Sequence, residues 1–147
     1  MYDLSKERIL AVDDEGDNLQ VLQATLEMLH DAVVKTVLSA DEGLDCLDSF
    51  HPTVILTDLS MPKADGYVFL YQIRQRPDTI RIPVIALTAH AMTGDRERII
   101  SAGFDGYISK PFDVMTLGDD LSLCLEQFHA QHPIQESTPP SVSIPPK

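Results

Sequence analysis

The sequence has few basic residues and no long apolar run, and each shortage excludes a class of protein. Lysine and arginine number 11 against 23 acidic residues, so the formal net charge is -12. A surface this acidic repels nucleic-acid phosphates and anionic lipids, which argues against direct nucleic-acid binding. No stretch approaches the roughly 20 apolar residues that cross a bilayer. The polar, charged N-terminus also argues against a signal peptide, so we expect no membrane insertion.

Cysteines are scarce as well. Cys46 and Cys124 lie inside helical patterns with no paired spacing, which predicts reduced thiols in a cytosolic protein. A length of 147 residues with 44% apolar residues suits one domain with its own core. From about residue 131 the composition changes to proline, serine and threonine. We therefore predict a domain over 6–130 and a disordered tail over 131–147.

Short apolar runs alternate with helical patterns along the chain. The runs are rich in β-branched residues and predict five strands, at 8–12, 33–38, 53–57, 83–87 and 106–109. Strands that are separated by crossover helices pair in parallel, and right-handed crossovers place helices on both faces of the sheet. The predicted fold class is therefore α/β, with a doubly wound parallel sheet.

The helical segments have their own apolar spacing and end signals. The first is predicted from the stripe Leu19, Leu22, Leu26 and Leu29, with Asp17 or Asn18 as its cap. Ser39 and Glu42 have the spacing of a capping box that opens the second. The third carries apolar residues from Val68 to Ile73, the fourth ends at Gly103, and the fifth opens near Asp113.

Charged and polar residues stand at the ends of four predicted strands. They are Asp13 and Asp14 after the first, Asp58 after the third, Thr88 after the fourth and Lys110 after the fifth. In a parallel sheet these ends share one rim. Three carboxylates on that rim repel one another unless a cation lies among them, and Mg²⁺ suits an all-oxygen site. The set predicts that Asp58 acts as a nucleophile that forms an acyl phosphate.

Each of these residues also has an ordinary interpretation when taken alone. Asp58 would cap a loop, Thr88 would be a core hydroxyl and Lys110 a surface lysine. The acidic run at 13–15 would be a solvated helix entry. The placement of all of them at the ends of four different strands favours a common site.

The motifs resemble those of a known family. Val12-Asp13-Asp14, Asp58 with Met61-Pro62 and Asp65-Gly66, Thr88-Ala89, and Lys110-Pro111 resemble the receiver domain of two-component response regulators, the family of the bacterial chemotaxis regulator, over about residues 6–130. The resemblance implies a flavodoxin-like sheet with strand order 2-1-3-4-5. It also implies transfer of a phosphoryl group to Asp58, with Mg²⁺, from a histidine kinase or a histidine phosphotransfer protein.

The resemblance assigns a metal site. Asp58 would be the phosphoacceptor and a metal ligand, Asp14 a direct ligand, and Asp13 a ligand through water. The backbone carbonyl of Ser60 would complete the protein ligands.

The resemblance also assigns a switch. Thr88 would move toward the phosphoryl group, Ala89 would leave room for it, and Tyr107 would turn inward with the threonine. Lys110 would hold a phosphoryl oxygen, and the peptide bond between Lys110 and Pro111 would be cis.

The predicted function is that of a single-domain cytoplasmic response regulator in a phosphorelay. Its catalysis would be limited to self-catalysed phosphotransfer and slow autodephosphorylation, and its output would be a protein partner on the face of the fourth helix, fifth strand and fifth helix. Met1 and the Pro-rich end favour a complete small protein. The alternatives are a receiver fragment of a hybrid histidine kinase or larger regulator, an unphosphorylated scaffold, and an aspartyl-phosphate phosphatase of the haloacid-dehalogenase type. That phosphatase needs an Asp-x-Asp motif on its first strand, and none follows Val12 here.

Overall fold

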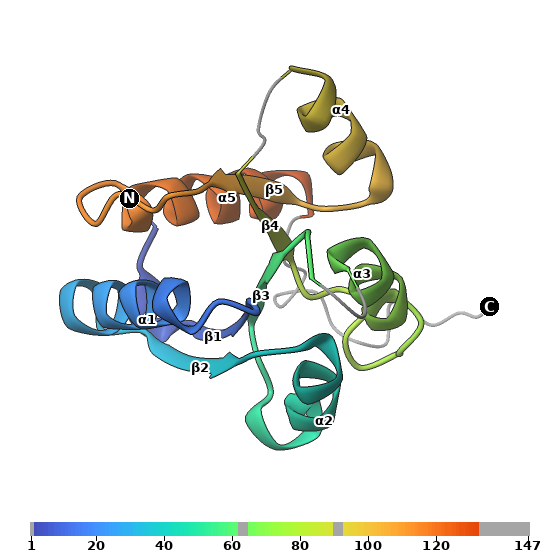
Figure 1. Cartoon of the computed structure of the whole chain (residues 1–147), viewed down its shortest axis with the longest axis horizontal. Coiled ribbons are helices and arrows are strands. Elements are labelled where there is room, and N and C mark those ends of the chain that lie inside the picture. The colour runs from blue at the N-terminus through green and yellow to red at the C-terminus, as the bar shows by residue number, and fades with distance from the viewer. Residues whose placement is uncertain (1, 62–64, 90–92, 133–147) are drawn as a thin grey trace, which may run out of the picture.

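One parallel sheet forms the centre of the molecule (Figure 1). The computed structural model describes residues 2–61, 65–89 and 93–132, so Pro62 and the segment from 133 onward lie outside it. The strands are β1 (Arg8–Val12), β2 (Val33–Val37), β3 (Val54–Asp58), β4 (Val84–Thr88) and β5 (Gly106–Ser109). Their order is β2-β1-β3-β4-β5, and all neighbours pair in parallel. The predicted fold class and strand order are confirmed.

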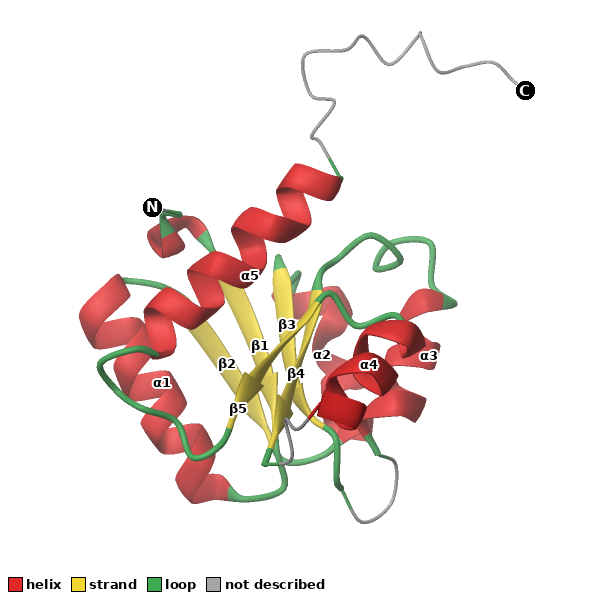
Figure 2. Cartoon of the chain, turned by 90° about the horizontal axis from the view of Figure 1, so that it is seen from above, coloured by secondary structure: helices red, strands yellow, loops and turns green. Residues whose placement is uncertain are grey.

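Helices cover both faces of this sheet. They are α1 (Gly16–His30), α2 (Ala40–Phe50), α3 (Gly66–Arg74), α4 (Thr93–Ala102) and α5 (Leu117–Gln131), with a short 3₁₀ turn η1 (Leu4–Lys6) before β1. Figure 2 shows α1 and α5 on one face and α2, α3 and α4 on the other. No helix in the described ranges is long and apolar enough to span a membrane.

The core divides into two clusters, one on each face. Leu22 and Leu26 of α1 pack with Leu121 and Leu125 of α5 against the first face, and all four are fully buried. Phe69 of α3 is among the residues that fill the second face, together with side chains of α2 and α4. Burying a leucine or phenylalanine side chain stabilises the fold by about 1.5–3 kcal/mol, so both faces anchor the strands firmly.

The strand register brings the carboxyl ends of the strands level with one another. Val12 pairs with Thr57, Asp58 with Leu87, and Thr88 with Ser109. The residues at and just after these pairs therefore share one edge of the sheet, which is where the candidate site lies.

Two helix ends match the sequence signals. The Ser39 hydroxyl accepts a hydrogen bond from the Glu42 amide at 3.1 Å, and the Glu42 carboxylate accepts one from the Leu38 amide at 2.9 Å. Gly103 follows α4 with φ of 112°, a left-handed conformation that suits glycine at this position. The Ser39 cap and the C-terminal glycine are confirmed, whereas the Glu42 carboxylate reaches the amide of Leu38, one residue before the N-cap, and not that of Ser39.

Other expectations at helices were wrong. The N-cap of α1 is Glu15, without a side-chain cap, because the helix already begins at Gly16 and so places both expected caps, Asp17 and Asn18, inside its first turn. Leu29, which was expected to continue the buried stripe of Leu22 and Leu26, is 58% exposed in the last turn of α1.

The start of the last helix also differs from the sequence prediction. Helix α5 begins at Leu117, because Asp113 first closes a turn by accepting a hydrogen bond from the Met115 amide.

Candidate functional site

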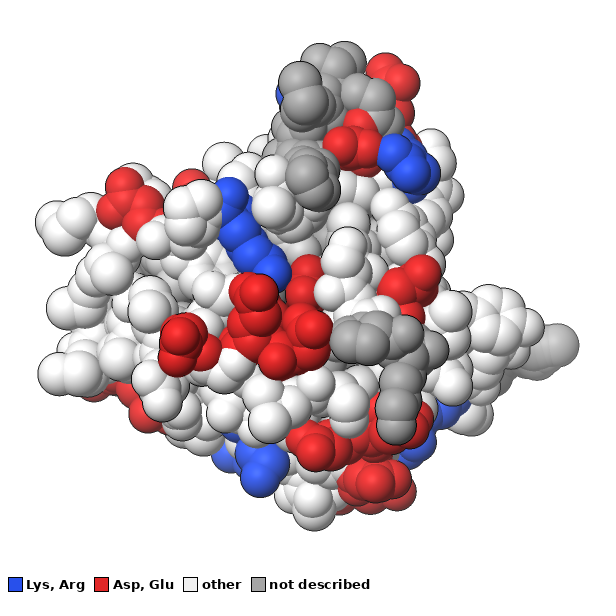
Figure 3. All heavy atoms as spheres, viewed as in Figure 1, with Lys and Arg blue, Asp and Glu red and all other residues white. Residues whose placement is uncertain are grey.

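The predicted strand-end residues meet around one cavity of about 410 Å³. Asp14, Asp58, Thr88 and Lys110 line it, together with Glu15, Asn18, Leu59, Ser60, Ala89 and Pro111. Figure 3 shows acidic side chains gathered near the middle of this view, next to a basic side chain. The sequence therefore placed four strand ends at a common site correctly.

Asp13 is a buried carboxylate next to the cavity, held by several polar contacts. Its carboxylate is fully buried and accepts hydrogen bonds from the Glu15 amide at 2.9 Å and from the Asn18 side chain at 3.4 Å. The ammonium of Lys110 lies 3.1 Å from its Oδ2. Buried carboxylates persist when they are paired and hydrogen-bonded in this way.

Asn18 is a supporting residue that the sequence analysis used only as a possible cap. Its Nδ2 donates to Glu15 Oε1 at 2.7 Å as well as to Asp13. An amide side chain in the first turn of a helix, three residues after an acidic N-cap, is the signal that could have indicated this contact.

Asp58 is the second carboxylate that Lys110 contacts. The residue is 5% exposed, and its Oδ1 accepts a hydrogen bond from the Ser60 amide at 3.2 Å and lies 3.3 Å from the Lys110 ammonium. Its Oδ2 accepts no hydrogen bond from the part of the chain that the structure describes. Oδ1 of Asp58 is thus held in place by protein donors, whereas Oδ2 has none among the described residues.

The charges of this cluster shift two pKa values. Burial and the nearby Asp13 carboxylate raise the pKa of Asp58, and the Ser60 amide and Lys110 only partly oppose them. Burial opposes the positive charge of Lys110, but the hydrogen bond and charge of Asp13, together with Asp58, outweigh it and raise the lysine pKa. The lysine therefore stays charged, whereas the Ser60 amide and Lys110 only partly stabilise the negative charge of Asp58 against burial and the Asp13 carboxylate.

The acidic residues fit a hard divalent cation. One carboxylate oxygen from each of Asp13, Asp14 and Asp58 lies within 4.8 Å of the others. Asp14 is exposed at the cavity wall, whereas the Asp13 oxygens already accept bonds from protein donors. Mg²⁺ prefers one or two carboxylates with several waters, and the clustered carboxylates beside this cavity provide the oxygen ligands.

The entry to α3 shows why the chain needs Asp65-Gly66. The Asp65 side chain caps α3 by accepting a hydrogen bond from the Val68 amide at 3.0 Å. A Cβ at position 66 would lie 2.5 Å from the Asp58 carbonyl oxygen and 3.0 Å from Leu59 Cα. Glycine lets the helix approach the end of β3 closely, which fixes the backbone that presents Asp58.

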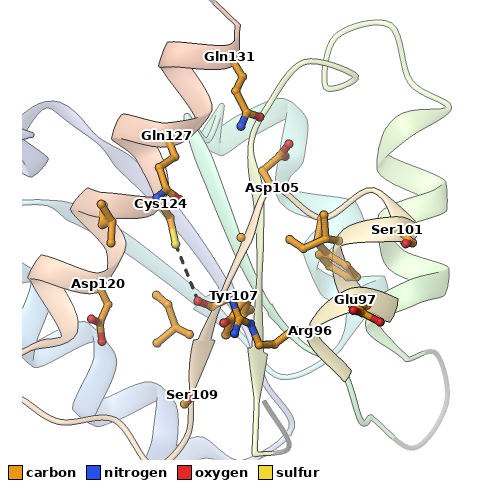
Figure 4. Close-up of a pocket in the computed structure, with 15 residues that line it drawn as sticks. Arg96, Glu97, Ser101, Asp105, Tyr107, Ser109, Asp120, Cys124, Gln127 and Gln131 are labelled. Atoms are coloured by element: carbon orange, nitrogen blue, oxygen red, sulfur yellow. Dashed lines mark hydrogen bonds between the residues drawn. The ribbon is translucent and has the colours of Figure 1, made fainter. Parts of the chain in front are cut away.

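The predicted switch residues occupy two places. Thr88 is 5% exposed at the end of β4, and Ala89 beside it is exposed at the cavity. The peptide bond between Lys110 and Pro111 is cis, the conformation that the resemblance implies. Tyr107 does not line this cavity; it lines a separate groove between α4 and α5 (Figure 4).

Comparisons with known proteins agree with this geometry. The family model of the response regulator receiver domain matches residues 9–122. Response regulator Rre1 of Synechocystis sp. is 40% identical over 105 residues, which cover 71% of this chain and 46% of that protein. The polar-differentiation response regulator DivK of Brucella ovis is 35% identical over 106 residues, which cover 72% of this chain and 85% of DivK.

Solved structures show the same similarity. The receiver domain of sensor histidine kinase PA1611 from Pseudomonas aeruginosa PAO1, solved with a magnesium ion coordinated in the active site cleft, is 32% identical and has a TM-score of 0.70. The match covers 83% of this chain and 97% of that domain. The chain spans about half the length of Rre1. The family model, the relatives and the strand-end site agree, and the chain belongs to the response regulator receiver domain family.

Proposed function

We propose that this chain is a stand-alone phosphoacceptor that receives a phosphoryl group on Asp58. Phosphorylation would then change which protein partner it binds. The donor would be a phosphohistidine of a histidine kinase or a histidine phosphotransfer protein. The observation that carries the proposal is Asp58 itself. Its Oδ1 is held by Lys110 and the Ser60 amide, Oδ2 accepts no bond from described residues, and the residue lines the cavity.

The chemistry would be a direct phosphoryl transfer. The Asp58 carboxylate oxygen forms a bond to phosphorus while the phosphorus–nitrogen bond of the phosphohistidine breaks, and the imidazole leaves and takes up a proton. Lys110 stabilises the charge on a phosphoryl oxygen, and the Thr88 hydroxyl donates to another. The Lys110 ammonium is already in place for this role, because it lies 3.3 Å from Asp58 Oδ1 before any phosphoryl group arrives.

Mg²⁺ would be held by Asp14 directly, by Asp13 through water, by Asp58, and by the backbone carbonyl of Ser60. When bound, the cation neutralises the crowded carboxylates and the incoming phosphoryl oxygens. The fit of three carboxylates to one ion supports this assignment, as does the magnesium ion in the similar PA1611 receiver domain.

The response would pass from Thr88 to Tyr107. Thr88 would move toward the phosphoryl group, past the small side chain of Ala89, and Tyr107 would turn inward. The output face would be the groove of about 950 Å³ between α4, β5 and α5, where Ile100 and Leu123 are each about half exposed. Half-exposed apolar side chains among polar and charged ones are the mixture found in many protein-binding surfaces.

The scope of the function is narrow in this proposal. Turnover would be limited to self-catalysed phosphorylation and slow autodephosphorylation, without hydrolysis of free phosphoesters. The match over most of DivK supports a stand-alone regulator. The two free cysteines support a reducing compartment such as the cytoplasm, where the phosphodonor would also act.

The experiment that tests the site is intact-mass measurement after incubation with acetyl phosphate, with and without Mg²⁺. One phosphoryl adduct is expected on the wild type with Mg²⁺ and none on Asp58→Asn, because an amide cannot attack phosphorus. Asp17→Asn, an exposed carboxylate in the first turn of α1, is the matched control and should label normally. Equal labelling of Asp58→Asn would overturn the assignment.

A further inference from the structure

Arg96 lies over the ring of Tyr107 in the groove between α4 and α5. The guanidinium carbon is 5.5 Å from the ring centroid, within the roughly 6 Å at which a cation is attracted to an aromatic face. Arg96 is exposed near the start of α4, and Tyr107 is half-buried on β5 (Figure 4). The contact therefore joins the two elements that form one wall and the floor of the groove.

Arg96 differs from the other arginines that contact described residues. Arg74 pairs with Asp105, Arg76 with Asp48 and Asp78, and Arg98 with Asp95. Arg8 contacts the Phe50 ring, but it also donates to the Phe50 carbonyl. Within the described ranges Arg96 makes no ion pair or hydrogen bond, although Glu97 and Asp120 line the same groove. Its partner is the face of Tyr107.

We infer that Arg96 is a positioning residue that holds the Tyr107 ring in the groove and so biases the switch toward its resting state. The inference rests on the proposed function, because in that function phosphorylation favours an inward position of the Tyr107 ring. The inward ring would leave the guanidinium, so every inward movement would lose this cation–π contact. Arg96 would thereby set how much of the unphosphorylated protein is already in the active conformation.

The size of the bias follows from the exposure of the contact. Exposed cation–π pairs are worth about 0.5–1 kcal/mol, which corresponds to an equilibrium shift of about two- to five-fold. If the inward state is the minor one, a ligand that selects it binds more tightly in proportion to its population. Removing Arg96 should therefore tighten binding of a phosphoryl mimic by about the same factor.

The experiment compares Arg96→Gln with Arg98→Gln in the full chain. Arg98 lies on the same helix and pairs with Asp95, so its substitution removes the same charge without touching the ring. The first readout is the Tyr107 ring signal in nuclear magnetic resonance with ¹³C-labelled tyrosine, assigned with Tyr107→Phe. The second is the apparent dissociation constant for beryllofluoride with Mg²⁺.

Arg96→Gln should raise the inward ring population and tighten beryllofluoride binding by about two- to five-fold, whereas Arg98→Gln should change neither. Arg96→Lys keeps a cation on the ring and should give a smaller change. In a Tyr107→Leu background the effect of Arg96→Gln on beryllofluoride binding should vanish, since no ring remains to be held. Loss of the effect in Tyr107→Leu would show that Arg96 acts through its contact with the ring and not through its charge alone.

The inference is overturned if Arg96→Gln leaves the ring signal unchanged, or if its effect matches that of Arg98→Gln or persists in Tyr107→Leu. Failure of the proposed function gives a different result. The wild type would then bind no beryllofluoride at Asp58, while the ring signal of the free protein would still report whether Arg96 holds Tyr107.

Discussion

The cavity at Asp58 and the groove between α4 and α5 differ in how their side chains are held. Next to the cavity, Asp13 accepts two hydrogen bonds, and Lys110 lies within 3.3 Å of both Asp13 and Asp58. In the groove, Leu123 is 53% exposed, and Arg96 rests on a single aromatic ring. The first arrangement fixes reacting groups, as phosphoryl transfer requires. The second can rearrange for less than about 1 kcal/mol per contact, which suits a surface that changes partners.

Lys110→Met should have the largest effect of the substitutions that distinguish the cavity from the groove. It leaves the fully buried Asp13 carboxylate without its countercharge, which destabilises a buried pair by about 3–5 kcal/mol. Loss of a charge that stabilises transfer should also slow phosphorylation by roughly 100-fold. Urea unfolding and adduct formation from acetyl phosphate measure the two effects.

Lys35→Met, at an exposed lysine of β2, is the control for losing a lysine and should change little. Adding Asp13→Asn to Lys110→Met should restore stability but not phosphorylation, because the amide needs no countercharge. If the double variant unfolded as readily as Lys110→Met alone, the unpaired Asp13 carboxylate would not be the cause of the lost stability.

Mg²⁺ should stabilise the cavity without affecting the groove. At 100 times its dissociation constant the cation raises the free energy of unfolding by about 2.7 kcal/mol. Asp58→Asn should lower this gain, since it removes one of the three clustered carboxylates. Thermal unfolding with a chelator and with excess Mg²⁺ measures it, and an equal gain for both proteins would remove Asp58 from the metal site.

The raised pKa of Asp58 predicts the sign of a pH effect in the absence of metal. A carboxyl group whose folded pKa is raised binds its proton more tightly when folded, so its contribution to stability is lost as pH rises from about 4 through the folded pKa. The stability advantage of Asp58→Asn over the wild type should therefore grow between pH 4 and pH 7 with a chelator present. A constant difference would mean that Asp58 has the same pKa in both states.

Gly66→Ala should damage the cavity through its backbone. The added Cβ meets the Asp58 carbonyl oxygen at 2.5 Å, and overpacking of this kind destabilises by about 1–3 kcal/mol. Gly16→Ala meets nothing within 4 Å and should stay within about 0.5 kcal/mol of the wild type. Urea unfolding of both variants would show similar losses if the close approach of α3 to β3 were unimportant.

Leu123→Glu should have the smallest effect on the chemistry. The side chain is about half exposed in the groove, so stability should change by no more than about 0.5 kcal/mol, and the rate of adduct formation should stay within about two-fold. A large loss of phosphorylation would show that the groove takes part in the chemistry. It would contradict the assignment of the chemistry to the cavity alone.

The sequence predicted the sheet and the members of the cavity well for physical reasons. Continuous apolar runs leave little choice of strand boundary, and parallel pairing forces Asp13, Asp58, Thr88 and Lys110 to one edge. Where the chain can satisfy a polar group in several ways, prediction failed. Asn18 supports Glu15 and Asp13 where it was expected to cap α1.

Contacts between helices and the sheet also escaped prediction. Arg96 and Tyr107 are eleven residues apart on α4 and β5, and no spacing rule indicates that a cation would lie over this ring. The reason for Gly66 became visible only with the backbone of Asp58 beside it. Such contacts depend on how elements pack, which composition and periodicity do not specify.

The measurement that tests the central claim most directly is the location of the phosphoryl group. An acyl phosphate formed with acetyl phosphate and Mg²⁺ can be reduced with borohydride, which converts the modified aspartate to homoserine, and peptide mass spectrometry then identifies the position. We expect homoserine at residue 58 in the wild type and at no other residue. Reduction at Asp13 or Asp14, or a stable phosphohistidine with residue 58 unchanged, would contradict the assignment of Asp58 as the phosphoacceptor.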